Sequence, residues 1–219
     1  MSDVVRNVAD YAEPRIRTLT VADLREALWQ GFDDFRAIPT QLVFIGLLYP
    51  VVALVAARAA AGDLLPLLFP LLTGVSLMGP VVAVGLYEIS RQRERGGPVS
   101  SAAAFDVLRS PAIGSLAFMT VLLLLIFAIW VGVAQAIYVS TMGKVVPDGI
   151  GAFAQSVLET GGGHRLIVWG NLVGAGFAAV VLAISVVSLP MLLDRNCGVV
   201  TAVRTSVRAV WRNPGVMGV

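Results

Sequence analysis

Charged residues are scarce in this chain: only 14% of its 219 residues are Asp, Glu, Lys or Arg. A soluble domain usually carries about 25% charge. Hydrophobic residues make up 57% of the chain, and its mean hydropathy is +0.83. A soluble globule of this size cannot cover its surface with so few charges. The composition therefore excludes an ordinary cytosolic enzyme and a disordered chain, and it indicates an integral membrane protein.

Cysteine and histidine are almost absent. Cys197 is the only cysteine, which excludes a disulfide within the chain. His164 is the only histidine and has no cluster of metal ligands around it, so we expect no metal site and no cofactor. The sequence holds no phosphate loop, dinucleotide fingerprint or Ser/His/Asp set. The net charge of +2 is too small to suggest a nucleic-acid partner. We therefore expect a non-catalytic protein that binds no nucleic acid.

Four apolar stretches are long enough to cross a bilayer, whose core of about 30 Å requires about 20 helical residues. Lipid satisfies no backbone hydrogen bonds, so a span must be a helix or part of a closed barrel. The run VLLLLIFAIW at 121–130 lacks the alternation of a barrel strand. We therefore predict an all-α, polytopic fold with four full transmembrane helices, at 40–57, 64–87, 113–139 and 166–193.

The Lys and Arg residues lie mostly on one side of these predicted spans. Residues 1–39 hold five, residues 88–112 hold four and residues 194–219 hold four, whereas the other side holds only Arg58, Lys144 and Arg165. The positive-inside rule places the basic side, and with it the N-terminus, in the cytoplasm.

A short pattern closes each predicted cytoplasmic segment: a large apolar residue, an arginine, one or two residues and a proline. The three copies are 35–39, 108–111 and 211–214. They suggest a repeated hairpin unit of an interfacial helix, a span, an outer loop and a second span. The organisation is then a polar segment at 1–17, units at 18–90 and 91–194, and the start of a third unit at 195–219. The last segment looks like the start of a fifth span, so we expect the natural chain to continue past Val219.

Each unit begins with a stretch that we expect to lie flat in the headgroup region as an amphipathic helix. In the first unit Thr20 and Asp23 can cap the helix start, and the second helix is expected at 99–109. In the third unit Arg204, Arg208 and Arg212 lie opposite an apolar stripe. The stripes are Val21, Leu24, Leu28, Phe32 and Phe35 in the first unit, and Val199, Val203, Val207 and Val210 in the third.

The outer loop of the second unit, 140–165, contains a further predicted helix. Residues 150–158 have helical spacing of apolar residues, and the glycines at 161–163 are expected to end this helix. A substrate lid is the less favoured interpretation of this loop.

Polar residues near or inside the spans are the candidates for function. Glu88 and Arg91 are three residues apart and can pair on one helix face, although a carboxylate at this boundary can also serve a proton path. Gln135 and Asn171 can hydrogen-bond a neighbouring helix or line a solute path. The residues expected to contact lipid phosphates or a partner are Arg36, Arg109 and Arg212, with Trp29 and Trp211 as interface anchors.

The run RTLTVADLREALWQGFDDFRAIP at 17–39, followed by LLPLLFPLLTG at 64–74 and GLYEISRQRERG at 85–96, resembles a bacterial family of integral membrane proteins, domain of unknown function 2189. The resemblance extends over nearly the whole chain and implies a six-helix protein of the bacterial inner membrane. Some relatives carry a label as cytochrome c oxidase subunits. The family has no established active site, so the resemblance assigns no functional residues.

Two functions fit these observations. The first is a non-catalytic accessory or assembly subunit that packs beside a larger membrane complex, respiratory or otherwise bioenergetic, and contacts membrane lipids and other membrane subunits. The alternative is a small-solute transporter or channel with a path near Gln135 and Asn171. A lipid-modifying enzyme is a third class, for which the sequence offers no catalytic set.

Overall fold

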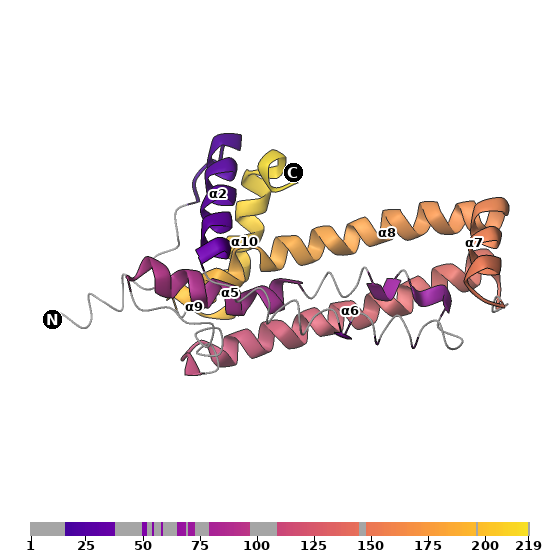
Figure 1. Cartoon of the computed structure of the whole chain (residues 1–219), viewed down its shortest axis with the longest axis horizontal. Helices are drawn as coiled ribbons and strands as arrows, with labels where there is room; N and C mark the ends of the chain where they lie inside the picture. Colours follow the sequence, from indigo (N-terminus) through magenta and orange to yellow (C-terminus); the bar gives the residue numbers. More distant parts are fainter. Residues whose placement is uncertain are drawn as a thin grey trace. The chain divides into compact units, whose positions relative to one another are not determined.

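The protein is all-α in the part that the structure describes (Figure 1). This computed structural model describes residues 16–37, 50–51, 54, 58, 65–68, 70–72, 79–96, 109–144, 148–195 and 197–218. Among them, the helices are α2 (Val21–Ala37), η1 (Leu65–Leu67), α5 (Gly79–Glu94), α6 (Ile113–Met142), α7 (Ile150–Glu159), α8 (Gly161–Ser185), α9 (Ser188–Arg195), α10 (Val199–Arg212) and α11 (Pro214–Met217).

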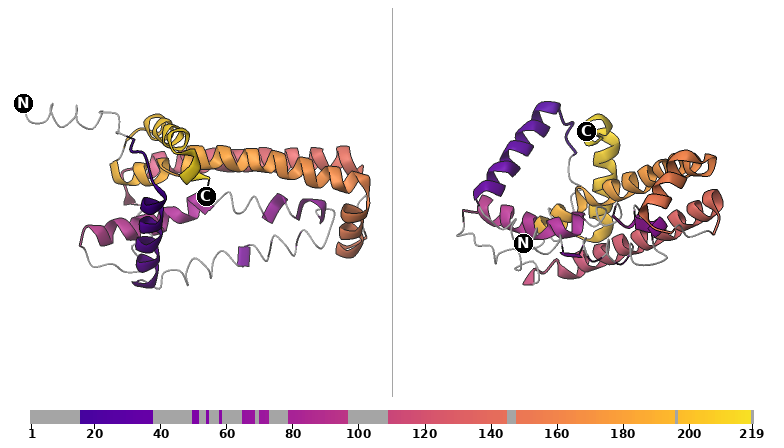
Figure 2. Two further views of the ribbon diagram at one scale, coloured as in Figure 1. Left: turned by 90° about the horizontal axis from the view of Figure 1, so that it is seen from above. Right: turned by 45° about the vertical axis from the view of Figure 1, so that its right-hand side comes forward.

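The chain divides into two compact units. One comprises residues 1–43, 80–121 and 182–219, and the other comprises residues 44–79 and 122–181. The first therefore holds α2, most of α5, α9 and α10, together with the start of α6. The second holds η1, α7, most of α8 and the remainder of α6, and in it α6 and α8 run side by side (Figure 2). Trp130 of α6 packs on Phe177 of α8 there, with 5.4 Å between the ring centroids.

Two helical segments are long and apolar enough to cross a membrane, Ile113–Met142 and Gly161–Arg195. They correspond to the third and fourth predicted spans. The first predicted span, 40–57, lies outside the described residues except at 50, 51 and 54, each of which is helical. The second, 64–87, is described only as η1, a few flanking residues and the start of α5. The second interfacial helix, expected at 99–109, also lies outside them except for Arg109.

Helix α5 continues beyond the predicted end of its span at Tyr87. It runs to Glu94 and ends where Gly96 takes a φ of 71° and donates its amide to the carbonyl of Arg93. The residues after Tyr87 are charged but favour helix, and they pair along it, because Glu88 accepts hydrogen bonds from Arg91 and Gln92. The change from apolar to charged composition therefore does not mark the end of the helix.

The glycines at 161–163 begin α8, which corrects the prediction that they end α7. Helix α7 ends at Glu159, and Thr160 is extended, with φ −103° and ψ 150°. The hydroxyl of Thr160 accepts the amide of Gly163 at 2.9 Å and so caps the start of α8. A Cβ atom on Gly162 would collide with the carbonyl of Thr141, and one on Gly163 with that of Val157. These glycines are needed because three helix ends meet closely.

Helices α8 and α9 are separated by a turn at Val186 and Val187. Pro190 has no N–H to donate back to Val186, and it is tolerated because it lies in the first turn of α9. The amide of Val187 donates instead to the hydroxyl of Ser206 on α10, at 3.1 Å. Ser206 is fully buried. A side chain distant in sequence therefore satisfies a backbone group at the break.

Helix α10 packs on α9 through small residues, not through the predicted valine stripe. The four valines are only half-buried, whereas the buried residues of the helix are Ala202, Thr205, Ser206 and Ala209. On α9 the buried residues are Ser188, Leu189, Leu192 and Leu193. Small side chains allow the backbones of α9 and α10 to approach closely. The hydrophobicity pattern of the sequence did not indicate that this small-residue face of α10 is the buried one.

Replacement of Ser206 by alanine should destabilise the protein by about 1–3 kcal/mol, because the partly buried amide of Val187 loses its acceptor. Thermal unfolding in a lipid nanodisc and hydrogen exchange at Val187 measure the loss. Thr201→Ala is the matched control, because Thr201 is exposed on the same helix. Equal stability of the Ser206 and Thr201 variants would contradict this role for Ser206.

Candidate functional site

Helix α2 begins with the capping arrangement that the sequence indicated. The amide of Thr20 donates to Asp23 Oδ2 at 2.7 Å, and the amide of Asp23 donates to Thr20 Oγ1 at 3.2 Å. The hydrogen bonds from the hydroxyl and then the amide of Thr20 hold the pKa of Asp23 below its ordinary value of 3.8. Asp23 therefore carries its negative charge at neutral pH, where it complements the positive end of the helix dipole.

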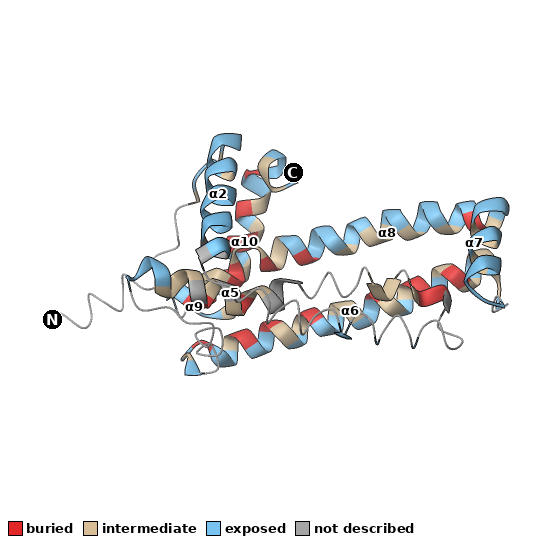
Figure 3. Cartoon of the chain, in the orientation of Figure 1, coloured by how far each residue is buried: buried red, intermediate tan, exposed pale blue. Residues whose placement is uncertain are grey.

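Three residues of the apolar stripe of α2 are exposed, namely Val21, Leu28 and Phe32. The exposed fraction is 72% for Val21, 66% for Leu28 and 56% for Trp29, and Trp29 packs edge-on against Phe32 with 6.1 Å between the ring centroids. The guanidinium of Arg36 lies 5.7 Å from the centre of the Phe32 ring. In Figure 3 nearly all of the described surface of α2 is exposed. This helix therefore presents a row of apolar side chains bordered by an arginine.

Helix α10 has three faces. One face carries small residues buried on α9, and a second carries Arg204, Arg208 and Arg212, all exposed. The third is apolar and ends at Trp211, whose side chain is 80% exposed. Trp211 and Arg212, both predicted contact residues, thus lie at the same end of the helix.

Asn213 ties the start of α2 to the end of α10 and is itself buried. Its Oδ1 accepts the amide of Leu19 at 2.7 Å, and its Nδ2 donates to the carbonyls of Arg17 at 3.1 Å and Ala209 at 3.0 Å. The sequence placed Asn213 in the third copy of the repeated pattern, but nothing in the pattern indicated this contact. Only the tertiary fold brings together two segments almost 200 residues apart in sequence.

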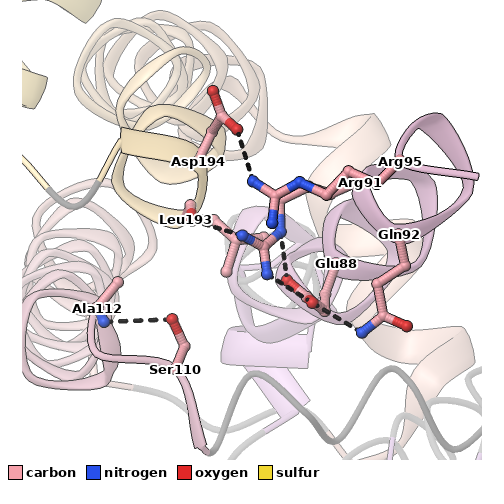
Figure 4. A network of polar contacts seen from close by, with 8 residues as sticks. All are labelled: Glu88, Arg91, Gln92, Arg95, Ser110, Ala112, Leu193 and Asp194. Atoms are coloured by element: carbon pink, nitrogen blue, oxygen red, sulfur yellow. Dashed lines mark hydrogen bonds and ion pairs between the residues drawn. The ribbon is translucent and has the colours of Figure 1, made fainter. Parts of the chain in front are cut away.

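Glu88 is 2% exposed and lies at the centre of a polar network between α5 and α9 (Figure 4). Arg91 donates Nε and Nη2 to the two carboxylate oxygens at 2.8 and 2.7 Å, as the three-residue spacing indicated. Gln92 donates at 2.9 Å to the same carboxylate. Arg91 also reaches the carbonyl of Leu193 at 3.4 Å. The carboxylate is thus paired and hydrogen-bonded, and the network joins the two helices.

An outer ion pair accompanies this network. Arg95 and Asp194 approach to 3.5 Å, but each side chain is 58% exposed. Such exposed pairs contribute at most about 1 kcal/mol because water screens them. Glu88 and Arg91 therefore form the stronger part of the connection.

Gln135 and Asn171 do not form a common polar path in the described part of the chain. Gln135 is exposed on α6. Asn171 is exposed on α8 and donates to the carbonyl of Ile167, in its own helix, at 2.7 Å. Asn171 lines a cavity in the second unit that does not include Gln135. The path between them stays a prediction.

This cavity has a volume of about 340 Å³ and lies between η1, α6, α7 and α8. Its walls are almost entirely apolar and include Trp130, Tyr138 and Phe153. Trp130 is 4% exposed, and its indole N–H donates to the carbonyl of Pro70 at 3.1 Å. The helical spacing of Phe153 and Val157 predicted the helix but not the cavity. The cavity was not predicted because the segments that form its walls are distant from one another in sequence.

A model of the family described as predicted integral membrane protein (DUF2189) matches residues 68–194. The chain belongs to this family. The DUF2189 match is shorter than the resemblance seen in the sequence, since it includes α5 to α8 and nearly all of α9 but leaves α2 and α10 outside. No significant match is found among curated proteins or solved structures. The Glu88 network and most of the cavity wall therefore belong to the DUF2189 region.

Removal of the Glu88 carboxylate should weaken the contact between α5 and α9. Glu88→Ala is expected to lower the free energy of unfolding by about 2 kcal/mol, because a charged acceptor of three hydrogen bonds is lost. Asp194→Ala, at the exposed pair on the same two helices, should cost less than about 1 kcal/mol. A double-mutant cycle of Glu88 and Arg91 measures the coupling, and a coupling near zero would refute the role of this pair.

Proposed function

We propose that this DUF2189 protein is a non-catalytic accessory or assembly subunit of a larger membrane complex. Its amphipathic helices α2 and α10 then lie in the headgroup region at the membrane surface. The observation that carries the proposal is Gln135, an amide exposed on the 30-residue apolar helix α6. A polar amide in hydrocarbon loses its hydrogen bonds to water, and this loss is unfavourable. A neighbouring transmembrane helix from another subunit would supply a partner for it.

Exposed apolar side chains on the two long helices support this proposal. Large apolar side chains are exposed along α6, and Val168, Trp169 and Leu172 are exposed on α8. Such surfaces are covered by lipid or by another apolar helix. Lipid tails alone leave the amide of Gln135 without a partner, whereas a second subunit satisfies the amide and covers the apolar residues together.

The charge distribution of α2 and α10 supports a position at the membrane surface. With about 100° per residue around a helix, Arg25 and Arg36 border the apolar stripe of α2, whereas Asp23, Glu26 and Gln30 fall on the opposite side. An anionic lipid surface attracts the arginines and repels the carboxylates. In this orientation the aromatic residues lie at headgroup depth, where Trp is favoured.

The arginine-rich segments then face the cytoplasm, and the protein lies in a bacterial inner membrane with its N-terminus inside. This orientation follows from the positive-inside rule and from thirteen of the sixteen Lys and Arg residues lying on that side of the predicted spans. Arg109, which lies just before α6, is the basic residue expected at the membrane surface in the second unit.

Gln135→Leu should weaken association with the partner subunits about 3- to 20-fold, since an interhelical hydrogen bond in a membrane contributes about 0.6–1.7 kcal/mol. The measurement is the stoichiometry of subunits recovered with the tagged chain from native nanodiscs. Gln155→Leu is the matched control, because Gln155 is exposed on α7 and pairs with Glu159 there. Recovery of the wild-type chain with lipid alone would contradict the accessory role.

Trp211 should be shielded from water in bilayers that contain anionic lipid. In a variant with Trp211 as the only tryptophan, we expect acrylamide to quench its fluorescence several-fold less in anionic nanodiscs than in the denatured chain. Arg204→Gln with Arg212→Gln should restore much of the quenching, because each arginine contributes about 1 kcal/mol near such a surface. Arg165→Gln, on the other predicted side, is the control. Full quenching in the bilayer would oppose an interfacial α10.

A further inference from the structure

The apolar cavity of the second unit is a binding site to which neither the family description nor the proposed function assigns a ligand. We propose that it holds one acyl chain of a membrane lipid. The inference rests on the chain being a membrane protein and does not depend on the accessory role. Its support comes from the chemistry of the wall, the depth of the site and its size.

The wall offers a ligand apolar contact and almost no polar recognition. Aromatic rings line it, and Tyr138 and Phe153 lie 6.3 Å apart between ring centroids. No charged side chain lines the cavity among the described residues. The indole N–H of Trp130 is committed to the carbonyl of Pro70, and the amide of Asn171 donates to Ile167. The ligand therefore gains from burial of apolar surface, which favours hydrocarbon over a polar solute.

The site lies where lipid chains are available. Helix α6 has 30 residues and is about 45 Å long, so about 7 Å extends beyond each side of a centred 30 Å hydrocarbon core. Tyr138 then lies near the boundary of the core, and Trp130 lies about 10 Å inside it. On α8, Leu166 and Asn171 are about 8 and 15 Å from the helix start, which is a similar range of depth.

The size of the cavity suits a chain. Its volume of about 340 Å³ is roughly twice the ~150 Å³ of an apolar cavity that holds one benzene molecule. This volume accommodates about a dozen carbon atoms, and the wall follows α6 from Trp130 to Tyr138 for about 12 Å. The cavity is open to its surroundings, and Ile167 in its wall is 39% exposed. An elongated, open, apolar space favours a chain over a compact molecule.

Gly170 provides a way to fill the cavity without disturbing its walls. It lines the cavity, and a Cβ atom placed on it meets no other atom within 4 Å. Gly170→Leu should therefore place its side chain in the space that the acyl chain occupies. Gly176→Leu is the matched control: Gly176 is exposed on the same helix, a Cβ there also meets nothing within 4 Å, and it does not line the cavity.

Trp130 is the reporter for the test. The full chain, with Trp29, Trp169 and Trp211 replaced by Phe, is placed in nanodiscs of phosphatidylcholine with brominated acyl chains. Bromine quenches tryptophan on contact, and Trp130 is too buried for bulk lipid to reach it outside the cavity. We expect strong quenching of Trp130, at least a threefold decrease of that quenching in Gly170→Leu, and no change in Gly176→Leu. Absence of quenching, or equal quenching in both glycine variants, would overturn the proposal.

A second measurement needs no cavity variant and keeps the test informative if Gly170→Leu does not fold. The wild-type chain is irradiated in nanodiscs that contain phosphatidylcholine with a diazirine on one acyl chain, and the modified peptides are mapped. Modification of the cavity wall at 130–138 and 153–157 supports the site. Modification confined to the exposed α8 residues Val168, Trp169 and Leu172 would show that lipid only surrounds the protein, and would refute it.

Discussion

A backbone amide or carbonyl inside a membrane has no water to bond, and this requirement determines where the helices of this protein can break. Val187 loses its helical partner where α8 gives way to α9, and Ser206 replaces it. At Pro70 the indole of Trp130 donates to a carbonyl beside the cavity. The hydroxyl of Ser206 thus satisfies the break between α8 and α9, and the indole of Trp130 joins α6 to the backbone at Pro70.

The same requirement explains why charge appears where it does. Glu88 is buried directly beyond the apolar part of α5, and this position is tolerated because its carboxylate accepts three hydrogen bonds from Arg91 and Gln92. The arginines of α10 lie instead on an exposed face of their helix. The first group of charges joins helices to each other, and the second lies on the exposed surface of the described fold.

Sequence patterns predicted features that depend on neighbours along the chain. The two long apolar helices, the cap at Thr20 and Asp23, and the pairing of Glu88 with Arg91 are of this kind. The buried face of α10, the tie made by Asn213 and the cavity were not predicted, because their partners are distant in sequence. The glycines at 161–163 were predicted to end α7, but they begin α8. Glycine occurs at both ends of helices, and only the close contacts of Gly162 with Thr141 and of Gly163 with Val157 show why glycine is required here.

The two amphipathic helices differ in a way that bears on how the protein meets the membrane surface. Helix α10 is anchored, because one face is buried on α9 and its end is tied by Asn213. The segment before α2 is held by the same asparagine, but Val21, Leu28 and Phe32 of the apolar stripe are exposed. The free energy available from burying that stripe is therefore not used within the described fold. In the proposed interfacial position this free energy would favour binding to lipid. Asn213 would then limit where α2 binds, because it fixes the start of α2 beside the arginine-bearing end of α10.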